Sequence, residues 1–224
     1  ESGGQVGDSG IAWNEVAQLN ISNSTKPISE LTIHHAKITQ GIIKKLDTLT
    51  LKVDSGSRSE TTLHHSATHL LHASLKEVLG DHVKQAGSFV TADRLRFDYT
   101  HFSPLSQAEK HRIEEQVNQK IRDNLTVSTR ELPMEKAVKE GAVALFGEKY
   151  GDDVRVVSMG GYSKELCGGT HTTATGNIGL FKIVSEGGIA SGVRRIEAVA
   201  GKSAYFTMQE ENKTLTSIRS ILKV

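Results

Sequence analysis

Three histidines and the one cysteine of this chain are the residues best suited to chemistry. His65 and His69 stand four positions apart, and Cys167 and His171 repeat that spacing much later in the chain. In a helix, residues four apart lie on one face about one turn from each other. One thiolate and three imidazoles suit tetrahedral zinc. If the two pairs meet in space, they can therefore hold a zinc ion.

The same residues also have an ordinary structural interpretation. Buried histidines donate to backbone carbonyls, and a lone cysteine packs as a small hydrophobe. Spacing alone leaves both interpretations open, but it excludes two classes of zinc enzyme. The metalloprotease motif needs Glu directly after the first histidine, where this chain has Ser66. Nucleobase deaminases need a Cys-x-x-Cys pair, which one cysteine cannot supply.

Three further histidines are candidates for supporting roles. His72 shares the helical stripe of His65 and His69 but has no second pair of its own. We expect it either to face solvent or to support the ligands from behind. His34 and His35 fall in a strand pattern, where neighbours point to opposite faces. We interpret both as structural.

The elements that must position these residues predict an α+β fold. Residues 1–55 are β-rich, with early glycines and period-two alternation at 31–33 and 49–53, and suggest a small barrel-like unit truncated at its start. Residues 56–200 combine helices with an antiparallel sheet. Residues 201–224 read as one polar connector helix.

Start and stop signals divide the central part further. Ser57 with Glu60 has the spacing of a capping box for a helix that ends at Gly80, and Ser106 with Glu109 starts a second helix. A short helix follows Pro133. Strands are predicted at 95–99, 154–159, 180–184 and 193–199, with glycine turns at 160–161, 168–169 and 187–188 between the later ones.

Composition bounds the class of protein. A net charge of +1 over 224 residues shows no global affinity for nucleic acid, so any basic patch must be local. A single cysteine excludes a disulfide framework and fits a reducing compartment. No apolar run or signal pattern predicts a membrane partner. The chain starts without Met and ends inside a helical pattern, so we expect a piece of a longer protein.

Several ordered motifs resemble the editing domain of alanyl-tRNA synthetases, from residue 1 to about 201. They are His-Ser-Ala-Thr-His-Leu-Leu-His (65–72), His-Val-Lys-Gln-Ala-Gly-Ser (82–88), Leu-Arg-Phe-Asp (95–98), Glu-Leu-Cys-Gly-Gly-Thr-His (165–171) and Gly-Val-Arg-Arg-Ile-Glu-Ala (192–198). Residues 1–8 resemble the family's glycine-rich motif. The related editing domain of threonyl-tRNA synthetase shares the two ligand pairs, but the Gly-Gly-Gln opening and the 192–198 run favour the alanyl family.

The resemblance implies an aminoacyl-tRNA deacylase within a cytoplasmic alanine–tRNA ligase. It would hydrolyse the ester of mischarged seryl-tRNA(Ala) and glycyl-tRNA(Ala), because synthetic pockets discriminate such small differences only roughly 10- to 200-fold. The implied partners are the acceptor end of tRNA(Ala) carrying serine or glycine and the remaining domains of the synthetase. Zinc is the implied cofactor, while ATP and magnesium would serve only the aminoacylation domain, which lies outside this segment.

The resemblance also assigns roles to residues. The implied zinc ligands are His65, His69, Cys167 and His171. Thr68 could read the serine hydroxyl, or merely bond back to a helix carbonyl. Gln85 could hold substrate or a water, or make an ordinary loop contact. Gly168 and Gly169 permit close approach of the backbone to metal or substrate, or form a plain turn.

The mechanism and the tRNA contacts stay open at this stage. Four protein ligands close a tetrahedral shell, so zinc either expands to five-coordinate and activates water toward a pKa of ~7 or only orders the pocket. No general base can be named. Five cations are candidate phosphate contacts, although each also fits an ordinary surface charge: Arg94, Arg96, Lys182, Arg194 and Arg195. Adjacent strand residues point to opposite faces, so we expect one of the last two to pair with a carboxylate and the other to meet phosphate.

Two rival functions fit the same residues. One is a free-standing deacylase of the same superfamily that acts in trans. The other is a zinc-stabilised tRNA-binding module without activity, in which chelation would lower the melting temperature with no catalysis to lose.

Overall fold

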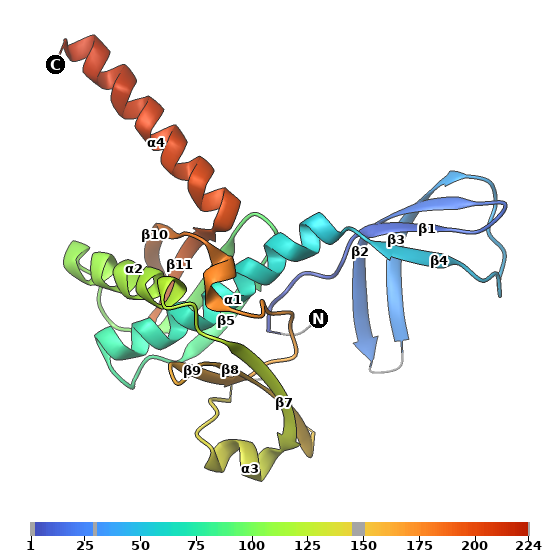
Figure 1. The fold of residues 1–224 in the computed structure, drawn as a ribbon, viewed down its shortest axis with the longest axis horizontal. Helices are drawn as coiled ribbons and strands as arrows, with labels where there is room; N and C mark the ends of the chain where they lie inside the picture. Colours follow the sequence, from blue (N-terminus) through green and yellow to red (C-terminus); the bar gives the residue numbers. More distant parts are fainter. Residues whose placement is uncertain (1–2, 29–30, 145–150, 224) are drawn as a thin grey trace.

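A computed structural model describes residues 3–28, 31–144 and 151–223, and its mixture of helices and antiparallel sheets confirms the α+β class (Figure 1). In these ranges the elements follow one another as β1 (Gly10–Trp13), β2 (Gln18–Ile28), β3 (Leu31–Gln40), β4 (Thr50–Val53), α1 (Ser55–Leu79), β5 (Gln85–Val90), β6 (Leu95–Thr100), α2 (Gln107–Arg122), β7 (Val127–Pro133), α3 (Met134–Lys139), β8 (Asp153–Met159), β9 (Ser163–Leu166), the 3-10 helix η1 (Thr175–Ile178), β10 (Phe181–Ala190), β11 (Val193–Ala200) and α4 (Gly201–Leu222).

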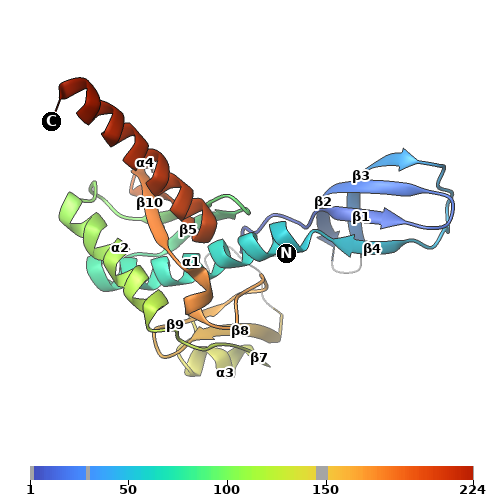
Figure 2. The same ribbon diagram turned by 45° about the horizontal axis from the view of Figure 1, so that its top comes forward.

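The N-terminal strands form an antiparallel sheet of their own, in the order β3-β2-β1-β4 across the described residues. This confirms the β-rich start. The sheet has a small core of Ala12, Leu19 and Ile21, and it stands apart from the rest of the chain (Figures 1 and 2). Closure into a barrel and the division of the chain at residues 55 and 200 stay predictions.

The main core lies between two helices and a second sheet, ordered β10-β11-β6-β5 in the described ranges. Leu70 and Leu75 of α1 and Ile113 of α2 are fully buried together with Phe97 of β6 and Ile196 of β11. The apolar stripe predicted for each helix thus faces the sheet. Below this core, β7-β8-β9 form a third antiparallel sheet, and β9 contacts the histidine-bearing helix α1.

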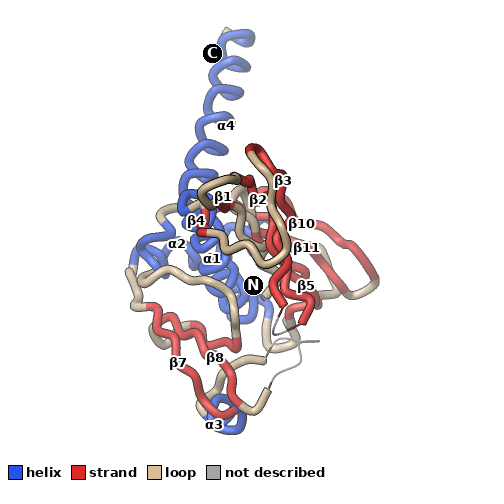
Figure 3. Tube along the Cα trace, turned by 90° about the vertical axis from the view of Figure 1, so that its right-hand side faces the viewer, coloured by secondary structure: helices blue, strands red, loops and turns tan. Residues whose placement is uncertain are grey.

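The last helix projects away from the core. Figure 3 shows α4 extending from the body of the chain, and among its described residues Ala204 is the buried one. No helix in the part of the chain that the structure describes is both long and apolar enough to cross a membrane.

Two local predictions are wrong. The capping residue of α1 is Asp54, whose carboxylate accepts the backbone N–H groups of Gly56 and Ser57, so the helix starts earlier than the Ser57 signal. Residues 187–188 form no turn: β10 runs on to Ala190 by absorbing bulges, and the chain turns at Gly192 with φ of +69°. The capping box of Ser106 and Glu109 is confirmed for α2.

The first part of the glycine-rich tract before β1 lies on the central body. Val6 N–H donates to the Val90 carbonyl at 3.0 Å, and Val90 N–H donates to the Gly4 carbonyl at 2.9 Å. Gln5 forms a parallel bridge with Val90. After this contact the chain crosses to β1, and it returns at Asp54, whose N–H donates to the Ser9 carbonyl at 2.9 Å.

Candidate metal centre

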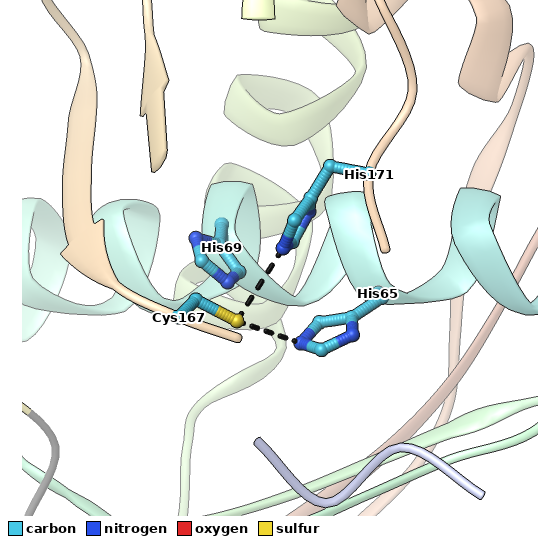
Figure 4. Close-up of side chains that lie close together, drawn as sticks. All are labelled: His65, His69, Cys167 and His171. Atoms are coloured by element: carbon cyan, nitrogen blue, oxygen red, sulfur yellow. Dashed lines mark hydrogen bonds between the residues drawn. The ribbon is translucent and has the colours of Figure 1, made fainter. Parts of the chain in front are cut away.

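The two distant histidine-bearing pairs meet in space. His65 and His69 project from α1, while Cys167 and His171 come from the loop between β9 and η1 (Figure 4). The Cys167 sulfur lies 3.4 Å from Nε2 of His65 and 3.4 Å from Nε2 of His171. One potential ligand atom of each residue lies within 4.8 Å of all the others. The chain thus presents a compact set of one sulfur and three imidazole donors.

This donor set fits a tetrahedral zinc ion. With Zn–S of about 2.3 Å and Zn–N of about 2.0–2.1 Å, a tetrahedral angle separates sulfur and nitrogen by about 3.5 Å. The two sulfur–nitrogen distances already match that value. Cysteine and histidine are also the ligands that zinc prefers in closed sites. His65, His69, Cys167 and His171 are therefore the residues that would hold the ion.

Burial keeps the imidazoles in the form that binds metal. It lowers the pKa of His65 to about 3, with His69 adding repulsion of the protonated form. Burial likewise lowers the pKa of His69 despite the attraction of Glu165, and it lowers the pKa of His171 well below its usual range. At neutral pH all three rings are uncharged, so their nitrogen lone pairs are free for a cation.

Two groups behind the ligands orient the imidazole rings. Oε2 of Glu165 lies 3.6 Å from Nδ1 of His69, too far for a hydrogen bond, so it acts on that ring through its charge and leaves Nε2 for the metal. Ser66 donates its hydroxyl proton to the Thr62 carbonyl at 2.9 Å, and its oxygen lies 3.3 Å from Nδ1 of His171. Because that proton is committed, the Ser66 oxygen accepts from the ring. Such partners set tautomer and ring direction in metal sites.

Glu165 is a buried carboxylate with its own support. Burial by itself raises its pKa, but attraction to His69 and the hydrogen bond from His72 outweigh it and bring the pKa to about 2. Nδ1 of His72 lies 3.1 Å from Oε1 of Glu165. His72 is itself buried, so of its two predicted roles it takes the one behind the ligands, through Glu165.

The loop glycines approach the site closely. A β-carbon at Gly169 would lie 2.0 Å from Cε1 of His65, so no side chain fits there. Gly3, with φ of +70°, also lies near the site: its β-carbon would be 3.0 Å from Nε2 of His65 and 3.3 Å from the Cys167 sulfur. Gly168 follows Cys167 in the same loop and is exposed. The N-terminal tract therefore forms part of the wall of the site.

The two predicted readers of substrate take different places. Thr68 is buried, and its hydroxyl donates to the His64 carbonyl at 2.9 Å, which is the helix back-bonding described for such residues. Gln85 is the first residue of β5, opposite Tyr99. Within the described ranges, no hydrogen bond joins Gln85 to His65, His69 or His171. Their roles in reading substrate stay predictions.

The five predicted phosphate contacts all have carboxylate partners. Arg195 binds Asp98 in a two-pronged pair at 2.7 and 2.8 Å, and Arg194 pairs with Glu186. Both neighbours are thus ion-paired, where one was expected to meet phosphate. The remaining pairs are Arg94–Glu197 at 3.6 Å, Arg96–Asp98 at 3.8 Å and Lys182–Glu211 at 3.2 Å.

The other histidines behave as structural residues. His34 and His35 lie on β3, where every described residue is exposed, and Nδ1 of His34 lies 2.9 Å from the Ser24 hydroxyl. His64, next to the cluster, is fully buried. Its Nδ1 bonds the Glu60 carbonyl at 2.9 Å, while Nε2 accepts the Ala200 N–H at 3.0 Å. It therefore links α1 to the end of β11 and takes no part in the cluster.

Comparison with known proteins places this site in a family context. Residues 154–197 match the family model described as threonyl and alanyl tRNA synthetase second additional domain. The chain is 51% identical over 222 residues to the alanine–tRNA ligase of Desulfosudis oleivorans. The alignment covers 99% of this chain and 25% of that protein. The resemblance to alanyl-tRNA synthetase is confirmed.

Two further relatives support the same assignment. The alanine–tRNA ligase of Desulfitobacterium hafniense is 51% identical over 223 residues, covering 100% of this chain and 26% of that protein. The enzyme of Xanthomonas euvesicatoria is 50% identical over 222 residues, covering 99% of this chain and 25% of the relative. The chain thus spans about a quarter of the length of the alanine–tRNA ligases that it matches.

Sequence reasoning missed three residues that contact the rings. Ser66 and Glu165 lie inside recognised motifs. In the sequence, however, Ser66 served only to exclude the metalloprotease class, and Glu165 was only one residue of a longer motif. Gln5 lies in the glycine-rich opening, and its side-chain oxygen is 2.7 Å from Nδ1 of His65. The glycine-rich motif was the available signal. Glycines let the backbone approach a site closely, so the polar residue that follows them can reach that site.

Proposed function

We propose that this segment hydrolyses the ester bond of seryl-tRNA(Ala), and of glycyl-tRNA(Ala), within an alanine–tRNA ligase. The observation that carries the proposal is the convergence of three neutral imidazoles and one cysteine in a single cluster. The similarity to alanine–tRNA ligases supplies the tRNA context. The acceptor end of tRNA(Ala) and the other domains of the synthetase are the proposed partners, in the cytoplasm.

A zinc ion bound by the cluster would supply Lewis-acid polarisation or a fixed electrostatic shape for the pocket. The protein's own part is to keep the donors deprotonated and oriented, which Glu165 and Ser66 do from behind. The exposed backbone of Gly168 beside Cys167 gives the ester a side of approach without a side chain in the way. Thr68 and Gln85 remain the proposed readers of the serine hydroxyl.

The test is release of serine from mischarged tRNA. Zinc-loaded wild-type protein should deacylate seryl-tRNA(Ala) much faster than alanyl-tRNA(Ala), and Cys167→Ala should reduce release to the uncatalysed rate. His111→Ala, on the exposed face of α2, is the matched control and should retain activity. If wild type and Cys167→Ala release serine equally slowly while both bind tRNA, the segment is a binding module and the proposal fails.

A further inference from the structure

A glutamine outside the predicted site stands behind one ligand ring. Oε1 of Gln5 lies 2.7 Å from Nδ1 of His65, while Nε2 of the same ring faces the Cys167 sulfur at 3.4 Å. Gln5 is only 8% exposed and belongs to the tract that pairs with Val90. It therefore reaches His65 from a segment that contributes no ligand.

The groups around Oε1 of Gln5 establish that this atom is the amide oxygen, and they fix the tautomer of the His65 ring. The Thr170 backbone N–H donates to the same Gln5 atom at 2.9 Å, and the Thr170 hydroxyl lies 3.1 Å from it. A backbone N–H can only donate, so the Gln5 atom that faces it is the carbonyl oxygen. That oxygen can only accept. Nδ1 of His65 therefore carries the ring proton, and the lone pair lies on Nε2, toward Cys167.

We propose that Gln5 is a positioning residue for metal binding at this centre. By accepting a hydrogen bond from Nδ1–H it selects the tautomer of His65 whose Nε2 can bind a cation. By accepting from Thr170 it also ties that ring to the loop carrying Cys167 and His171. One carbonyl thus joins helix α1, the ligand loop and the N-terminal tract, and holds the donors in place before the ion arrives.

The three histidines then share one arrangement. Each Nδ1 faces an oxygen of the protein: Gln5 behind His65, Glu165 behind His69 and Ser66 behind His171. Gln5 differs because it is the neutral group brought in from outside both ligand segments. A purely structural role, bracing the loop through Thr170, would leave the tautomer of His65 unaffected, and the two roles can be separated by measurement.

The first test measures zinc affinity by competition with a chelator, using the full chain. Gln5→Leu removes the acceptor at similar size and should weaken zinc binding by about 10- to 100-fold. Gln5→Glu keeps an acceptor oxygen at the same reach and should stay near the wild-type affinity. Gln40→Leu, exposed on β3, is the matched control and should bind as wild type does. Wild-type affinity in Gln5→Leu would overturn the proposal.

The second test needs no measurement of activity. Nitrogen-15 NMR of the metal-free wild-type protein should report His65 as the Nδ1–H tautomer, and an Nε2–H tautomer would overturn the proposal. In folded Gln5→Leu the Nδ1–H preference should be lost, whereas Gln5→Glu should retain it. Since neither test involves tRNA, failure of deacylation and failure of this inference are distinguishable.

Discussion

Two polar regions of this molecule arrange their polar groups in opposite ways. One is the histidine–cysteine cluster, and the other, called the basic face, consists of the five predicted phosphate contacts on and beside β6, β10 and β11: Arg94, Arg96, Lys182, Arg194 and Arg195. In the cluster, four donors converge on one point, and their supporting oxygens lie on the outside. On the basic face, every predicted cation already has a carboxylate: Arg194 has Glu186, and Arg195 has Asp98. Metal-binding atoms that converge on one point indicate a ligand, whereas a satisfied ion pair indicates structure.

Acidification of the metal-free protein should give the largest effect. The unfolded histidines titrate near pH 6.5, while burial lowers the folded pKa values of His65 (to about 3), His69 and His171, so the unfolded chain binds more protons between those values. The free energy of unfolding is therefore highest above about pH 6.5 and falls as the pH drops. The His65 ring should cost about 1.4 kcal/mol between pH 7.5 and 5.5, and His69 and His171 add to this cost in the same direction.

Urea unfolding of the metal-free protein at both pH values measures this effect. His171→Asn removes one of the three rings and should reduce the pH dependence of stability on the same linkage argument. A free energy of unfolding that does not change between the two pH values would show that the cluster admits protons while folded, contrary to its burial.

Replacing the carboxylate behind the cluster should have the next largest effect. Glu165→Gln keeps the size of the side chain but removes the charge that accepts the hydrogen bond from His72, and weakening a buried hydrogen bond to a charged group costs about 1.5–3 kcal/mol. Thermal unfolding with and without zinc measures it. Glu115→Gln, exposed on α2, should change stability by less than about 0.5 kcal/mol. Equal effects of the two variants would contradict the role of Glu165.

Substitutions of arginines on the basic face should have the smallest effects on stability. They also distinguish a structural role of an arginine from a contact with tRNA. Arg194→Ala leaves the buried Glu186 carboxylate without its guanidinium and should destabilise the fold by about 1–2 kcal/mol. Arg94→Ala, on a side chain that is 57% exposed, should stay within about 0.5 kcal/mol. If Arg194→Ala instead raises KM for tRNA and leaves the melting temperature unchanged, Arg194 is a phosphate contact after all.

The sequence predicted elements and ligand candidates better than the contacts around them. The stripes of α1 and α2 and the alternation at Leu95–Tyr99 follow from local periodicity, and the four clustered residues follow from spacing and family resemblance. The supporting oxygens do not, because Gln5 reaches His65 across 60 positions and Ser66 reaches His171 across 105. The same holds for the arginines, since Asp98 lies 97 positions from Arg195 and competes with any external phosphate.

Local signals also failed where two of them competed. Ser57 with Glu60 has the spacing of a capping box, but Asp54 is a stronger acceptor placed earlier and sets the first turn of α1. Gly187 and Gly188 suggest a turn, yet both pair with β11, and the bulges of β10 fall at neighbouring positions. Composition alone does not rank such alternatives, because tertiary pairing decides between them.

The hydrogen bond between Asp54 N–H and the Ser9 carbonyl has a consequence for the modularity of the chain. The backbone leaves the central body at Ser9 and re-enters it at Asp54, two residues that touch. The four-stranded sheet is therefore topologically an insertion: it begins and ends at one point of the host structure. Its strands can lengthen, shorten or change in number without moving the two points at which the sheet joins the central body.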